Sequence, residues 1–125
     1  MTTKIIEDHI RWSLNDIRKN MQELRETNHV AIKFSKDKKI DSKKRETFIL
    51  IAKVCGSLLA FFSCCEKAYQ LEDQENKLQF IRLIEVNKNK AIERLNELIE
   101  FIKKNNIQDA DLEFWENYKK DLERI

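Results

Sequence analysis

The sequence predicts an all-α protein, an up-and-down antiparallel helical bundle with three long helices plus a shorter C-terminal helix. The 125 residues contain no proline and a single glycine, the two residues on which turns between strands most depend. Charged residues make up 37% of the chain and hydrophobic residues 42%, and the apolar positions recur at helical spacing. A chain of this length has room for one core, so we expect a single domain over residues 1–125.

The first helix is predicted over residues 4–32. Its apolar stripe repeats at alternating spacings of four and three residues, the heptad pattern of a helix that packs along one side. Ile5 and Trp12 lie off this stripe, on the outward face of the predicted helix. We expect them either to bind a protein partner or to pack beneath the short last helix.

A basic connector is expected at about 33–42. The stretch 33–45 contains seven Lys and Arg residues against two Asp residues, enough cations to contact phosphates or an anionic membrane surface. Phe34 is its one aromatic ring, and no known nucleic-acid-binding motif surrounds it. The stretch is therefore either a solvated loop or a nucleic-acid site. The candidate phosphate contacts are Lys36, Lys38, Lys39, Lys43, Lys44 and Arg45.

The second helix is predicted over about 43–71 and contains the most apolar stretch of the chain, 48–65. This stretch has the minimum length of a membrane span, but Lys53 within it makes insertion about neutral in free energy. We therefore favour a helix buried in a soluble bundle over a small membrane protein inserted through 48–65.

Apolar side chains surround this second helix on nearly all sides, which is more than one small bundle is expected to cover. Small residues at every fourth position also leave a shallow groove in which another helix can approach closely. We therefore expect a second copy of the chain to cover the rest, giving a homodimer. The predicted interface residues are Ala52, Gly56, Leu59, Ala60 and Phe62.

The third helix is predicted over roughly 74–104 and the last over about 109–124. The third has a wide apolar face suited to a bundle core, interrupted by Lys88. On the last helix, Asp111 favours the positive start and Trp115 belongs to the buried side.

No catalytic centre, metal site or cofactor is predicted. Glu26 and His29 have the spacing of half a di-iron motif, but the other half would need a glutamate at Ile6, three residues before His9. The three cysteines all lie in the apolar stretch, and their odd number indicates free thiols in a reducing cytoplasm.

These observations favour a cytoplasmic, non-enzymatic protein–protein interaction module, such as a small inhibitor, immunity protein or accessory subunit. The Lys-, Asn- and Ile-rich composition is typical of an AT-rich genome and indicates a bacterial or phage origin. The alternative function is that of a nucleic-acid-binding accessory protein using the basic segment 33–45.

Overall fold

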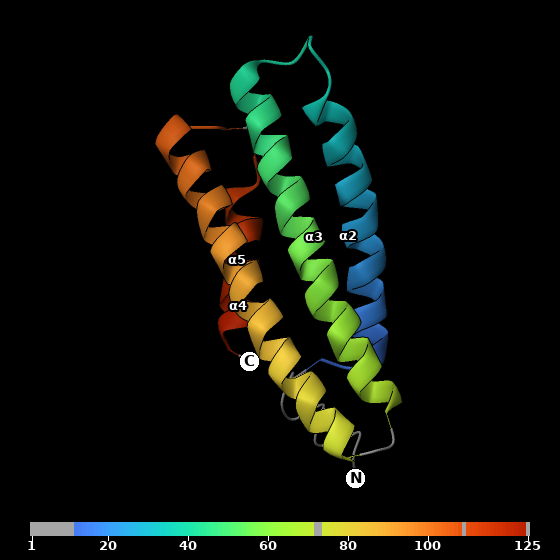
Figure 1. Ribbon diagram of the computed structural model, residues 1–125. Coiled ribbons are helices and arrows are strands. Elements are labelled where there is room, and N and C mark those ends of the chain that lie inside the picture. Colours follow the sequence, from blue (N-terminus) through green and yellow to red (C-terminus); the bar gives the residue numbers. More distant parts are fainter. Residues whose placement is uncertain (1–11, 72–73, 109, 125) are drawn as a thin grey trace.

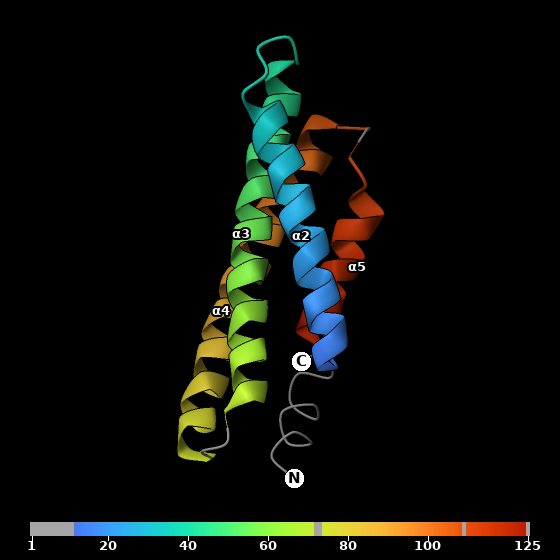
Figure 2. The same cartoon turned by 90° about the vertical axis from the view of Figure 1, so that its right-hand side faces the viewer.

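The computed structural model describes residues 12–71, 74–108 and 110–124, which form an antiparallel up-and-down bundle (Figure 1). Its helices are α2 (Leu14–Ser35), α3 (Ser42–Gln70), α4 (Gln74–Asn105) and α5 (Leu112–Glu123). α3 lies between α2 and α4 and packs along both. The shorter α5 packs on α4 and lies beside α2 in the second view (Figure 2). The predicted fold class is confirmed.

The ends of the later helices follow from their capping residues. The Asp41 carboxylate accepts a hydrogen bond from the Lys43 amide at 3.1 Å, and the Asp111 carboxylate accepts one from the Phe114 amide at 3.1 Å. Each satisfies an amide that has no partner inside its helix. α3 and α4 lie within one residue of their predicted bounds, and α5 begins three residues later than predicted.

The prediction of one continuous helix over 4–32 is wrong, because the chain is not helical at Trp12 and Ser13. Ser13 has an extended backbone, and its hydroxyl accepts a hydrogen bond from the Asp16 amide at 3.1 Å. A serine in this role starts a new helix rather than continuing an old one. The rest of the predicted helix, residues 4–11, lies outside the described residues.

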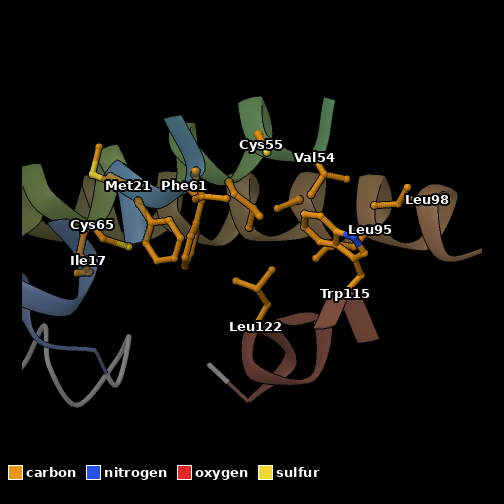
Figure 3. Close-up of a cluster of buried hydrophobic side chains, with 14 of the residues drawn as sticks. Ile17, Met21, Val54, Cys55, Phe61, Cys65, Leu95, Leu98, Trp115 and Leu122 are labelled. Atoms are coloured by element: carbon orange, nitrogen blue, oxygen red, sulfur yellow. The ribbon is translucent and has the colours of Figure 1, made fainter. Parts of the chain in front are cut away.

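The large side chains of α3 fill the core of the bundle. Val54, Leu58, Phe61 and Phe62 are all 0% exposed. On α5, Trp115 and Leu122 project toward the side chains of α3 and α4 (Figure 3). Other large side chains of α3 are only half-buried: Phe48, Ile49, Leu50, Ile51 and Leu59. The expectation that α3 leaves apolar surface for a partner therefore stays a prediction. Gly56 and Ala60 are exposed whereas Cys55, Cys65 and Ala68 are buried, so side-chain size alone does not decide which residues face the core.

α3 is also long and apolar enough, by length and composition alone, to cross a membrane. Core helices of soluble bundles pass the same test. Within the described residues, the large hydrophobic side chains that are exposed belong to α2, α4 and α5. They are Val30, Ile32, Leu78, Leu83, Val86 and Phe114.

Candidate functional site

Trp12, a predicted partner-binding residue, is half-buried and packs against the core. Its ring lies 5.2 Å from the ring of Phe62 and 6.1 Å from that of Phe61, measured between centroids. The Tyr69 hydroxyl also donates a hydrogen bond to the Trp12 carbonyl oxygen. The outward placement of Trp12 is thus wrong, because the break at Ser13 frees the ring from the helix pattern. Ile5, its predicted companion, lies outside the described residues.

The five residues predicted as a dimer interface differ in exposure along α3. Gly56 and Ala60 are exposed, Ala52 and Leu59 are half-buried, and Phe62 is fully buried. Phe62 is therefore a correction, since a ring enclosed by its own chain offers no surface to another. The other four residues stay a predicted interface, but the exposed ones bury little apolar area.

The predicted phosphate contacts gather at the tip of the α2–α3 hairpin, at the top of Figure 1. Lys36, Lys38, Lys39 and Lys43 are exposed there. Arg45 is only partly accessible, and its Nε is buried without a hydrogen-bond partner among the described residues. Lys44, also exposed, contributes to a groove described below. Phe34 stacks on Phe48 with ring centroids 5.3 Å apart.

A concave apolar site lies where the first turns of α3 face the α4–α5 connection. We call it the Trp115 groove, after the residue that is 5% exposed there. It has a volume of about 370 Å³. One wall comes from α3, and the other comes from Ile107, Ala110 and the start of α5. The lining residues are Lys44, Thr47, Phe48, Ile51, Ile107, Ala110, Asp111, Phe114 and Trp115.

The second wall of the groove is shaped by the way α4 ends. The Ile107 amide donates to the Ile102 carbonyl at 3.1 Å and the Asn106 amide to the Lys103 carbonyl at 3.3 Å. Asn106 has a φ of 51°, the left-handed geometry that asparagine tolerates at a helix end. This pair of bonds forms a Schellman motif, which ends α4 abruptly and directs Ile107 to the groove.

Few polar groups interrupt the lining. The Thr47 hydroxyl donates to the Lys43 carbonyl at 2.9 Å, so it is satisfied inside α3. Each wall carries one charged residue: Lys44 lies on α3, and Asp111 is the N-cap of α5. Phe114 is 48% exposed and packs edge-on against Trp115, with centroids 4.9 Å apart. A large ring therefore stands unburied beside an apolar hollow.

The groove continues along α2. A second hollow of about 290 Å³ shares Phe48, Ile51 and Trp115 with it and reaches Val30 and Ala31. A third, of about 230 Å³, lies between α2 and α5 and includes Tyr118. Burial, followed by the charges of Cys55, Glu23 and Asp121, raises the pKa of Tyr118 above its usual range. Tyr118 is thus a neutral phenol in this hollow.

Reactive and metal-binding groups do not converge on this site. Among the described residues, no group of three or more His, Cys, Asp and Glu side chains lies close enough to hold a metal ion. Burial raises the pKa values of Cys55 and Cys65, which leaves both as neutral thiols. The arrangement fits the binding of apolar groups.

The fold and the site define a helical bundle with an apolar surface groove. Comparison of the chain with protein-family models, with curated proteins and with solved structures found no match.

Sequence reasoning missed the groove, because its walls come from distant parts of the chain. It placed Trp115 on the buried side of the last helix, and that part is confirmed. Phe114 next to it was the remaining signal, since a large ring outside the predicted buried side of a helix can mark a binding surface.

Proposed function

We propose that the protein is a non-enzymatic protein–protein interaction module that receives large apolar side chains of its partner in the Trp115 groove. The observation that carries this proposal is the hollow of about 370 Å³ with the half-exposed ring of Phe114 beside it. Exposed apolar surface of this kind generally marks a binding site in a soluble protein. A small inhibitor, immunity protein or accessory subunit would use it in this way.

The elongated form of the site favours a protein partner. The second hollow adjoins the groove through Phe48, Ile51 and Trp115, so neighbouring apolar side chains of one segment have separate places to insert. Segments that bind in grooves commonly present such anchors at helical spacing. Buried aromatic and aliphatic anchors of this kind supply most of the affinity in protein interfaces.

The neutral fluorescent probe N-phenyl-1-naphthylamine, which stands in for the partner's apolar side chains, tests the proposal. We expect saturable binding to the dilute folded protein with about one site per chain. Ala110→Trp should abolish most of the binding, because Ala110 lines the groove and the new ring fills it. Ala60→Trp adds the same ring on the exposed face of α3 and should leave binding unchanged. Equal binding by both variants, or none by the parent protein, would refute the proposal.

A second candidate function is nucleic-acid binding by the basic tip. Its support is the exposure of Lys36, Lys38, Lys39 and Lys43 together at one end of the hairpin. Contacts with phosphates release counterions, so the affinity should fall steeply as salt rises. Gel-shift titrations with generic duplex DNA and single-stranded RNA measure this. Absence of binding at low salt would eliminate this function, and exchange of these four lysines for glutamine is the matched variant.

A further inference from the structure

We propose that the third hollow, between α2 and α5, binds an organic ammonium group, a function that does not depend on the Trp115 groove receiving a protein partner. This α2–α5 hollow has a volume of about 230 Å³ and lies where the two helices run side by side (Figure 2). Its lining residues on α5 are all aromatic, and those on α2 include one carboxylate. They are Asn20, Glu23, Leu24, Thr27, Phe114, Trp115 and Tyr118. Aromatic rings beside a carboxylate are the surroundings in which proteins bind alkylated ammonium groups.

The three rings stand at steep angles to one another. The ring of Phe114 makes an angle of 84° with that of Trp115, at a centroid distance of 4.9 Å. It makes an angle of 64° with that of Tyr118, at 5.8 Å. The rings therefore form the sides of a corner rather than one flat stack. The hydroxyl oxygen of Tyr118 is buried, so the ring is the part of this side chain that faces the hollow.

The charge around the α2–α5 hollow is negative. Glu23 is the one charged residue of its lining, and it forms no ion pair among the described residues. Burial raises the pKa of Tyr118, and the charges of Cys55, Glu23 and Asp121 raise it further, so two carboxylates act on this end of α5. The adjoining second hollow likewise has Glu26 as its one charged lining residue. The charge therefore favours a cation over a neutral group of the same shape.

The size and chemistry of the hollow favour an alkylated ammonium over other cations. A cavity of about 150 Å³ accommodates benzene, a molecule about as large as a trimethylammonium group, so about 230 Å³ is sufficient. Methyl groups around the nitrogen bury apolar surface on the rings, whereas the ammonium of an unmodified lysine is strongly hydrated. A metal ion fits less well, because the described residues contain no group of three or more metal-binding side chains.

The two tryptophans allow a test by NMR in ¹⁵N-labelled protein, since Trp115 lines the hollow and Trp12 packs on Phe61 and Phe62. The probe is choline, and the control ligand is 3,3-dimethylbutan-1-ol, which has the same shape without the charge. Choline, titrated at constant ionic strength, should shift the indole N–H signal of Trp115 saturably and leave that of Trp12 unchanged. The neutral alcohol should bind at least about tenfold more weakly. Trp12→Phe and Trp115→Phe assign the two signals.

Two variants test the charge and the rings separately. Glu23→Gln should weaken choline binding about fivefold and leave binding of the neutral alcohol unchanged, because the carboxylate acts on the charge alone. Phe114→Leu keeps an apolar side chain but removes one ring, and it should also weaken choline binding about fivefold. Glu93→Gln is the matched control, since Glu93 is exposed on α4 and lines none of the three hollows. Circular dichroism verifies that the helices remain.

The results also separate this inference from the proposed function. Ala110→Trp should remove binding of N-phenyl-1-naphthylamine but leave choline binding unchanged, because Ala110 does not line the α2–α5 hollow. Equal affinity for choline and the neutral alcohol, or undiminished choline binding by Glu23→Gln, overturns the inference. Absence of choline binding in a protein that binds the naphthylamine refutes the inference alone.

The amide of Nα-acetyl-trimethyllysine distinguishes the two sources of such a group. Tighter binding of this compound than of choline would indicate a methylated side chain of another protein. Tighter binding of choline would indicate a free small cation.

Discussion

Among the titratable groups of α3, burial raises the pKa values of two thiols the most. Cys55 and Cys65 are 0% exposed and lie among the large side chains of that helix. Burial penalises the thiolate, so it raises the pKa of Cys55 from 9.0 to about 12. It raises the pKa of Cys65 further, with a contribution from Cys64. Both residues therefore act as small hydrophobic groups at neutral pH.

The stability of the fold should fall as pH rises above about 9. Because the pKa of Cys55 is higher in the folded protein than in the unfolded chain, the folded state binds more protons between pH 9 and 12. The unfolded state is then favoured as pH rises through that window. Between pH 9 and about pH 10, each buried thiol should lower the free energy of unfolding by about 1 kcal/mol. Urea denaturation at pH 7 and at alkaline pH measures it.

The control for this prediction compares slopes rather than stabilities. The double variant Cys55→Ala, Cys65→Ala is less stable at every pH, since it leaves cavities in the core. Its stability should nevertheless depend less on pH above 9 than that of the parent protein. Cys64→Ala retains both buried thiols and should keep most of the steeper dependence, since burial is the larger cause of the raised pKa of Cys65. Equal slopes in all three proteins would show that the thiols are not responsible.

At the scale of the helix, part of the exposed apolar surface of α3 comes from small residues. Its inward face holds Leu58, Phe61 and Phe62, and its outward face holds Gly56 and Ala60. Small apolar residues cost little when exposed, so the helix can be apolar all round and still belong to one small bundle. Hydrophobicity alone therefore overstates how much of α3 needs a partner.

The single glycine provides a test at this scale. A Cβ added at Gly56 would meet nothing within 4 Å, so the fold itself does not require glycine there. Gly56→Ala should raise the free energy of unfolding by about 0.5–1 kcal/mol, because alanine loses less backbone entropy in a helix. Ala60→Gly, on the same exposed face, should lower it by a similar amount. Urea denaturation measures both.

A loss of stability in Gly56→Ala would mean that another backbone approaches α3 at this point. That outcome would support the predicted α3 interface as a site of self-association. Dilution distinguishes the two explanations, since the effect of a lost interface disappears once the protein is monomeric.

The sequence was sufficient for the helices because the signals that set them are local. Asp41 and Asn106 mark helix ends through their own side chains and backbone, and the near absence of glycine and proline leaves few other breaks. Trp12 was misplaced because Ser13, which can lie within a helix or start one, starts one here. The groove was beyond prediction, since Phe48 and Ile107 become neighbours only through the packing of α4 on α3.

For the whole molecule, the two tryptophans report on opposite ends of the bundle. Trp12 packs on Phe61 and Phe62 near the far end of α3, whereas Trp115 lies by Phe48 and Ile51 near its start. α3 connects both sites through one continuous core. A single core of this size is expected to unfold in one cooperative step. The two rings should then lose their environments together.

Trp12→Phe and Trp115→Phe each leave one reporter, and urea denaturation followed by tryptophan fluorescence measures each end separately. Within each variant, the fluorescence midpoint should equal the midpoint from far-ultraviolet circular dichroism, because the whole bundle unfolds at once. Trp115→Phe should shift its midpoint further below that of the parent, since Trp115 is more deeply buried than the half-buried Trp12. A fluorescence transition that precedes the loss of helix in either variant would divide the bundle into two units and contradict the single domain predicted over 1–125.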